Sequence, residues 1–170
     1  QIRQVFQRYS SNIEPLSLDE AYLDVTDPVE PGLSATEVAR RIRRAIREET
    51  GLTASAGVSF NKFLAKVGSD HQKPDGMTVI RPRDAMPFIA VLPVEKIPGV
   101  GPVTARNMHA HGIRTGADLR QFDEDELVQR FGKSGRYYYR VCRGLDERPV
   151  RTHRGRKSLG AERTFETNVT

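Results

Sequence analysis

The hydrophobic positions of the first eighty residues alternate between spacings typical of strands and spacings typical of helices. Short β-prone segments predict four strands, at residues 13–17, 21–26, 53–59 and 77–80. Apolar residues three and four apart predict helices at 34–50 and 61–70, and the chain opens within a further amphipathic helix. The order ββαβαβ predicts a mixed sheet with helices on one face.

The clearest of these helices covers residues 34–50. Ser34 and Glu37 form the S-x-x-E pattern of a capping box at its start, and Gly51 is expected to end it. The residues that repeat at helical spacing, and are therefore expected to be buried, are Val38, Ile42, Ala45 and Ile46.

The pattern changes after residue 80, where short helices and glycine-rich turns replace the strands. The expected helices are residues 84–92, 103–111, 123–131 and 136–143. Residues 148–163 hold six basic residues and one acid, which is typical of a linker. We therefore expect an α+β chain with two modules, residues 1–80 and 81–147, followed by a basic linker at 148–170.

Charge is distributed unevenly between these modules. Residues 1–80 carry a net charge of −1 and residues 81–170 a net charge of +6, within a total of +5. Such asymmetry suggests that the second half meets a polyanion, although a merely basic surface has the same composition.

Composition also limits the cellular compartments and the kinds of site that we expect for the protein. No apolar run approaches the roughly 20 residues that a membrane-spanning helix needs. Cys142 is the only cysteine, so the chain can form neither an internal disulfide framework nor a cysteine-based zinc site. We expect a reducing, cytoplasmic setting and no membrane partner. The chain begins without methionine inside a helical pattern, so we expect it to be a piece of a longer protein.

Two adjacent carboxylates, Asp19 and Glu20, lie between the first two expected strands. Magnesium is a hard ion that prefers carboxylate and phosphate oxygens. Neighbouring side chains point to opposite faces of a regular strand, so both acids could serve one site only at a turn or bulge. The expected hairpin supplies that turn. The alternative is a solvated Asp-Glu pair at the surface.

Basic residues follow in the helix at 61–70. Lys62 and Lys66 are four apart and share a helix face, while Phe63 and Val67 share another face, which we expect to be buried. Lys73 stands just past the helix, before Pro74-Asp75-Gly76. A lysine near paired carboxylates is a suitable contact for a triphosphate. A solvated lysine face is the alternative.

The most specific local signal is IPGVGPVTAR at residues 97–106. Gly99 and Gly101 allow a sharp turn, and Pro102 suits the first position of a helix. The helix start then presents unpaired N–H groups, which bind a phosphate readily. Such a helix-hairpin-helix holds the DNA backbone without reading bases, whereas a plain helix-helix turn is the alternative. A second glycine turn, at residues 131–136, offers another basic loop before a helix.

The order of these motifs resembles that of the Y family of error-prone, translesion DNA polymerases. Residues 13–26 (IEPLSLDEAYLDVT) resemble its second catalytic motif, and residues 61–76 (NKFLAKVGSDHQKPDG) resemble its N-K-x-L-A-K-x-x-S-D-x-x-K-P-x-G segment. Residues 97–101 resemble its thumb hairpin. Arg156-Lys157-Ser158 and Glu162-Arg163-Thr164 resemble the lead into its little-finger domain. The resemblance covers essentially the whole chain.

The resemblance implies that residues 1–80 are the C-terminal part of a polymerase palm and residues 81–147 a thumb. Asp19 and Glu20 would be catalytic and would be two of three acids that bind two Mg²⁺ ions, one activating the primer 3′-hydroxyl and one neutralising the triphosphate. Lys73 would bind the nucleotide. The residues expected to contact DNA phosphates are Gly99, Val100, Gly101, Thr104, Lys133 and Arg136.

The implied partners are primer-template DNA, a deoxynucleoside triphosphate and, through a C-terminal region outside this chain, a sliding clamp. The family's first metal-binding aspartate and its fingers lie upstream of the residues matched here. We therefore expect the isolated chain to be inactive or nearly so. Two alternatives remain: a non-catalytic helix-hairpin-helix module of a repair protein, which needs no role for Asp19 or Glu20, and a nuclease that uses both acids.

Overall fold

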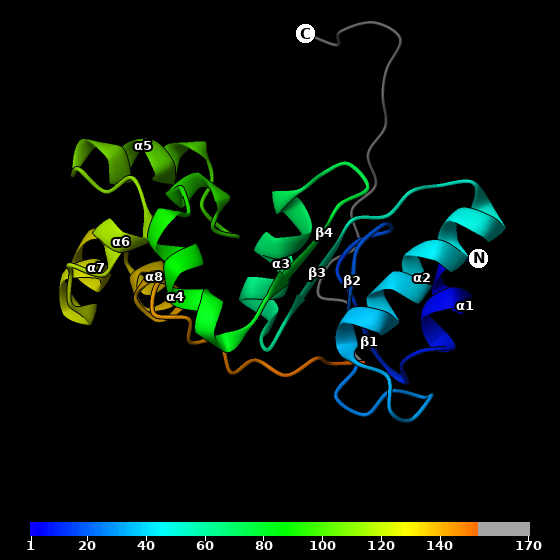
Figure 1. Ribbon diagram of the computed structural model, residues 1–170. Coiled ribbons are helices and arrows are strands. Elements are labelled where there is room, and N and C mark those ends of the chain that lie inside the picture. The colour runs from blue at the N-terminus through cyan, green and yellow to red at the C-terminus, as the bar shows by residue number, and fades with distance from the viewer. Residues whose placement is uncertain (153–170) are drawn as a thin grey trace, which may run out of the picture.

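The four expected strands form, but they pair as two separate two-stranded sheets (Figure 1). The structure is a computed structural model that describes residues 1–152. β1 (Asn12–Pro15) and β2 (Ala21–Asp24) are antiparallel, whereas β3 (Ala56–Ser59) and β4 (Met77–Ile80) are parallel. The α+β class is confirmed, but the expectation of one mixed sheet is wrong for the described residues. A cleft lined by both β2 and β3 separates the two sheets, so no ladder joins them.

Helices pack around these sheets, and between β4 and residue 152 helices are the regular elements that the structure describes. The helices of the first half are α1 (Ile2–Gln7), α2 (Ala35–Thr50) and α3 (Lys62–His71). Those of the second half are α4 (Pro82–Val91), the 3-10 helix η1 (Val94–Lys96), α5 (Pro102–Ala110), α6 (Gly116–Leu119), α7 (Glu124–Phe131) and α8 (Lys133–Val141). Among the described residues, no helix is long and apolar enough to span a membrane.

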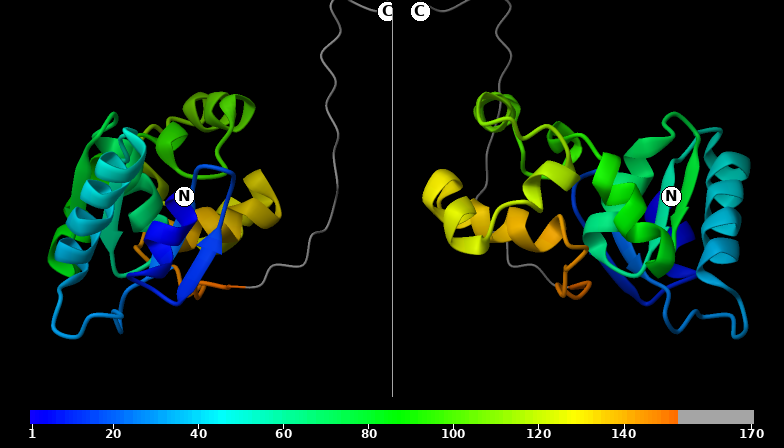
Figure 2. Two further views of the ribbon diagram at one scale, coloured as in Figure 1. Left: turned by 90° about the vertical axis from the view of Figure 1, so that its right-hand side faces the viewer. Right: turned by 60° about the vertical axis from the view of Figure 1, so that its left-hand side comes forward.

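The caps and the apolar face of α2 follow the sequence pattern. The Ser34 hydroxyl accepts a hydrogen bond from the Glu37 N–H, and the helix ends at Gly51 in the left-handed conformation. The four residues expected on its inner face are buried against α1. Figure 2 shows α2 running along the outer side of the first half, far from the helices α5–α8.

Hydrophobic packing divides the described residues into two clusters. The smaller joins α1 to α2, whereas the larger starts at Phe63, Leu64 and Val67 of α3 and continues through α4 to α8. The core therefore runs across the boundary expected near residue 80, which stays a prediction. The expected linker lies mostly outside the described residues, as do Arg156-Lys157-Ser158 and Glu162-Arg163-Thr164.

Two glycines explain how closely α3 lies on β3. Gly68 has no evident role in the sequence pattern, but a Cβ built there would lie 3.3 Å from the Cα of Gly57. A Cβ at Gly57 would meet the Ala65 carbonyl oxygen at 1.9 Å and the Ser69 nitrogen at 2.4 Å. The helix backbone thus rests directly on the strand, which leaves no room for a side chain at residue 57.

We expect Gly57→Ala to lower the free energy of unfolding by at least about 2 kcal/mol, because the added methyl forces α3 away from β3. Urea denaturation followed by circular dichroism measures this change. Gly101→Ala is the control, since Gly101 has a negative φ and no atom lies within 4 Å of an added Cβ. Equal unfolding midpoints for the two variants would contradict the close contact.

Candidate active site

Asp19 and Glu20 lie in the loop that joins β1 to β2, as the sequence predicts. The loop is closed by the backbone N–H groups of Leu16 and Ser17, which both donate to the Glu20 carbonyl oxygen at 2.8 and 3.3 Å. Both acids precede β2, so strand alternation does not separate them. Both line the cleft between β2 and β3, which has a volume of about 540 Å³.

The Asp19 carboxylate is exposed and held by its own loop. The Ser17 hydroxyl donates to it at 2.6 Å, and this hydrogen bond lowers the pKa of Asp19 below its ordinary value. Positive charge on Lys73 and Lys66 lowers the pKa further. Asp19 is therefore a charged oxygen donor at neutral pH.

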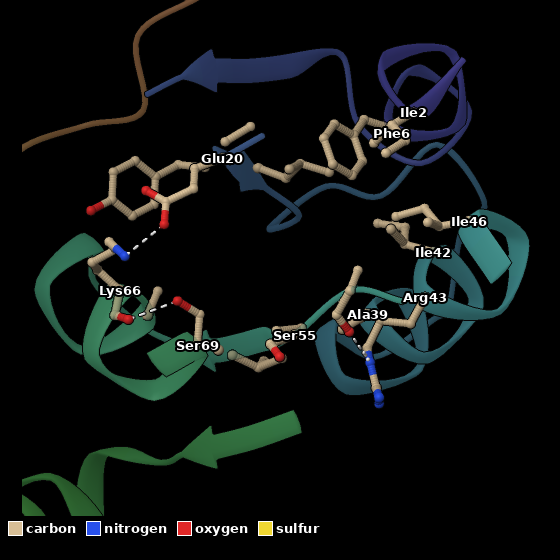
Figure 3. Close-up of a pocket in the computed structure, with 18 of the residues that line it drawn as sticks. Ile2, Phe6, Glu20, Ala39, Ile42, Arg43, Ile46, Ser55, Lys66 and Ser69 are labelled. Carbon is tan, nitrogen blue, oxygen red and sulfur yellow. Dashed lines mark hydrogen bonds and ion pairs between the residues drawn. The ribbon is translucent and has the colours of Figure 1, made fainter. Parts of the chain in front are cut away.

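A line of ion pairs joins Glu20 to Lys66 of α3 and to Lys73 just beyond this helix. Lys66 Nζ donates to Glu20 at 2.9 Å and to Asp70 at 2.8 Å, and Asp70 also pairs with Lys73 at 2.5 Å. Burial alone would lower the pKa of Lys66, but its hydrogen bonds to Asp70 and Glu20 outweigh that effect and raise it. Figure 3 shows Lys66 pointing across the cleft to Glu20.

Side chains of α2 form hydrogen bonds with the turn that follows Lys73. Arg43 donates to the Asp75 backbone oxygen at 2.6 Å, to the Asp75 carboxylate at 2.8 Å and to the Ala54 carbonyl at 2.8 Å. Arg47, one helical turn later, reaches the same carboxylate at 3.0 Å. The sequence pattern missed Arg43, because its contact with Asp75, 32 residues away, leaves no periodic signal. It also missed Asp70, although a spacing of four residues from Lys66 is a local signal of an ion pair.

Lys62, in contrast, is buried and does not line the cleft. Its ammonium group pairs with Glu14 at 2.6 Å, and the two side chains are only 10% and 8% exposed. The solvated lysine face considered for α3 is therefore wrong for Lys62. Lys66 and Lys73 are the lysines of this segment that line the cleft.

The remaining walls of the cleft are apolar. Ile2 and Phe6 of α1 face Ile42 and Ile46 of α2 across it, as Figure 3 shows. The cleft thus has a charged end at the β1–β2 loop and an apolar end between the two helices.

The charged end suits a divalent cation that brings further ligands with it. Within residues 1–152, no group of three or more His, Cys, Asp or Glu side chains could hold a metal ion. Asp70 pairs with both Lys66 and Lys73 and so offsets part of their positive charge beside Asp19 and Glu20. Magnesium commonly takes one or two protein carboxylates and completes its shell with water and substrate phosphates. Asp19 and Glu20 fit that requirement.

The expected glycine hairpin forms at the start of α5, in the all-helical half of the molecule (Figure 1). Gly99 adopts a φ of 89°, which favours glycine, and Pro102 takes the first helical position. The hydrogen bond from Ala105 to Gly101 is the first of the helix, so the N–H groups of Val103 and Thr104 precede it and have no intrahelical partner.

Two details of this hairpin differ from the sequence-based picture. The 3-10 helix η1, which the sequence analysis missed, stands between α4 and the hairpin. The Val100 side chain is 9% exposed and belongs to the core, so only its backbone could face a phosphate. Val103 is 72% exposed beside the glycines.

The second basic loop is shorter than expected. α8 begins at Lys133, so Lys133 and Arg136 stand in the first turn of a helix rather than in a loop before residue 136. Gly135 is buried against α7, where a Cβ would lie 2.0 Å from the Leu127 oxygen, so it serves packing rather than a turn. Lys133 is exposed, whereas Arg136 pairs with Glu124 at 2.7 Å.

Comparison with known proteins gives matches along nearly the whole chain. The model of the impB/mucB/samB family matches residues 1–70, and that of the DNA polymerase-iota thumb domain matches residues 95–146. DNA polymerase IV of Alkalilimnicola ehrlichii is 59% identical over 97% of the chain, and that of Gluconobacter oxydans is 55% identical over all of it. These matches cover 46% and 48% of the two relatives, so the chain spans about half their length.

Solved structures agree with the sequence relatives. DinB from Sulfolobus solfataricus superposes with a TM-score of 0.80 at 36% identity, over 88% of this chain and 44% of that one. A chimeric Y-family DNA polymerase gives a TM-score of 0.82 at 36% identity, over 90% and 45%. Family models, sequence relatives and solved structures all match this chain to a fragment of a Y-family DNA polymerase.

Proposed function

We propose that this chain is part of an error-prone, template-directed DNA polymerase that copies past lesions, and that it supplies part of the palm and the thumb. One observation carries the proposal: Asp19 and Glu20 share a cleft with Lys66 and Lys73. The proposal draws further support from the relatives named DNA polymerase IV and from a structural neighbour described as an insertion ternary complex of Dbh DNA polymerase, with a TM-score of 0.80.

Asp19 and Glu20 are the residues that would hold magnesium in this chain. Two bound magnesium ions would supply charge neutralisation for the triphosphate and a lower pKa for the attacking primer hydroxyl. Because the chain spans about half the length of its relatives, we assign the third metal-binding acid to the part of the polymerase outside it. On this basis the isolated chain is inactive or nearly so.

Lys73 is the residue that would bind the triphosphate of the incoming nucleotide. Its side chain is 53% exposed and pairs with Asp70, which holds it within electrostatic reach of Asp19. The same Asp70 holds Lys66 against Glu20. The acids and lysines therefore stand preorganised beside each other, which reduces the reorganisation that substrate binding requires.

The hairpin at the start of α5 would hold the primer-template backbone. The free N–H groups at this helix start, together with the Thr104 hydroxyl, suit phosphate oxygens. Lys133 and Arg136 at the start of α8 would add charge to the same interaction. Phosphate contacts carry no direct base information, so binding should be independent of sequence, as copying any template requires.

Three further features of the complete polymerase belong to the same proposal. It would use primer-template DNA and deoxynucleoside triphosphates, and it would meet a sliding clamp through a region outside this chain. It would act in the cytoplasm.

Replacing both acids tests the catalytic role. In the full-length polymerase, Asp19→Ala/Glu20→Ala should lower primer extension by a factor on the order of 10³ or more, because several kcal/mol of metal-dependent stabilisation are lost. Primer-template affinity should be retained, because the thumb is untouched. Asp27→Asn, an exposed acid just after β2, is the matched control and should extend normally. Unchanged extension by the double variant would favour a non-catalytic DNA-binding module.

Salt dependence tests the thumb. We expect Lys133→Gln to reduce the slope of log affinity for duplex DNA against log salt by about 0.9, the value for one lost phosphate contact. Fluorescence anisotropy at several salt concentrations gives the slope. Arg3→Gln removes an exposed charge from α1, far from the thumb, and should leave the slope unchanged. A flat response of the unaltered protein to salt would contradict the thumb assignment.

A further inference from the structure

Residues 144–151, here called the strap, connect the thumb back to the palm. They leave the end of α8 and run to β1, as the orange segment of Figure 1 shows. Over these eight residues the strap makes polar contacts with the start of α3 and with Glu14 of β1. Residues from 148 onward were expected to form a linker, but Pro149 and Arg151 are hydrogen-bonded to Lys62 and Glu14.

The first anchor of the strap is at the N-terminus of α3. The Asn61 side chain caps the helix by accepting from Leu64 N–H, and its amide also donates to the Gly144 carbonyl at 2.9 Å. Asp146 accepts a second helix N–H, that of Phe63, at 2.9 Å. A carboxylate at this end of a helix is favoured by the free N–H groups and the helix dipole. The thumb thus supplies a cap to a palm helix.

Asp146 also forms hydrogen bonds with another strap residue, Arg148, which in turn lies against the thumb helix α8. The Asp146 side chain is 3% exposed and receives two hydrogen bonds from the Arg148 guanidinium, at 2.6 and 2.7 Å, and one from the Arg148 backbone N–H, at 3.4 Å. Burial alone would raise the pKa of Asp146, but the hydrogen bonds from Arg148 outweigh it and lower the pKa. The Arg148 guanidinium also stands 5.6 Å from the centre of the Tyr137 ring on α8. One buried carboxylate therefore joins α3 to the end of the thumb.

The second anchor covers the buried Lys62–Glu14 pair. The Arg151 N–H donates to the Glu14 carboxylate at 2.7 Å, and Lys62 donates to the Pro149 carbonyl at 3.3 Å. Glu14 stands opposite Tyr22 in the β1–β2 ladder, five residues before Asp19. The strap is thus hydrogen-bonded to the hairpin that carries the catalytic acids.

We infer that the strap fixes the position of the thumb relative to Asp19 and Glu20, and that Asp146, Glu14 and Lys62 are positioning residues for nucleotidyl transfer. Apolar packing between α3 and the thumb is non-directional, whereas these hydrogen bonds fix orientation. A primer held by the thumb must be placed relative to the acids to within about 1 Å of the productive geometry in order to react well. This inference rests on the proposed function.

A distance measurement tests the geometry without any requirement for activity. Spin labels at Leu18→Cys and Val103→Cys report the separation of the acidic loop from the thumb hairpin, and both positions are exposed. Cys142 is 0% exposed and should not take up a label. We expect Asp146→Asn to broaden the distance distribution, measured by pulsed electron spin resonance on this chain. Glu147→Gln, the neighbouring strap acid with an 83% exposed side chain, should not change it.

An activity measurement on the full-length polymerase gives the second readout. Asp146→Asn should lower the extension rate at saturating nucleotide by about tenfold or more, because the primer terminus is misplaced. The primer-template Kd should stay within about twofold, since the phosphate contacts of the thumb are intact. A role limited to stability would change the melting temperature but neither the rate well below it nor the distance distribution.

If Asp146→Asn does not fold, Glu14→Leu/Lys62→Met carries the same test, because apolar replacement of a buried ion pair often preserves stability. An unchanged distance distribution would overturn the inference, and so would a broadened one with normal extension. Failure of the unaltered full-length protein to extend a primer would instead overturn the proposed function, and the distance result would still report on the strap.

Discussion

The buried ion pair between Lys62 and Glu14 is the contact on which the arrangement of this molecule depends. It joins the start of α3 to the β1–β2 hairpin, and its two residues lie 48 positions apart in the sequence. Removing one partner of such a pair costs about 3–5 kcal/mol, because the other charge stays buried and unpaired. The pair therefore fixes the position of the hairpin relative to the helix. One turn along the same helix, Lys66 reaches Glu20, so the charged end of the cleft depends on this pair.

Besides that pair, α3 makes three further sets of contacts. Its glycine-lined side rests on β3, its apolar face begins the core that continues into the thumb, and its N-terminus binds the strap. The acids of the hairpin, the lysine that follows the helix and the thumb hairpin are all connected to the same ten residues. Function in the proposed polymerase thus depends on a helix that lines the cleft with three residues, Ala65, Lys66 and Ser69.

Local signals in the sequence predicted the elements well, because they depend on neighbouring residues. The capped helix α2, the acidic loop and the glycine hairpin all formed where apolar spacing and turn residues placed them. Features that depend on distant contacts were not predictable in this way. Arg43 of α2 holds the turn after Lys73, and Lys62 is buried by its pairing with Glu14, 48 residues away. The cleft between β2 and β3 depends on the relative position of the two sheets, which no local pattern predicts.

The central claim is that Asp19 and Glu20 form one part of a metal site that a nucleotide completes. Paramagnetic broadening by Mn²⁺ in nuclear magnetic resonance spectra of this chain tests it directly. The account predicts broadening centred on the amides of Asp19 and Glu20, spreading to Lys73 when a deoxynucleoside triphosphate is added. Broadening centred instead on the acidic first turn of α7, at Glu124, Asp125 and Glu126, or no effect of nucleotide at Lys73, would contradict it.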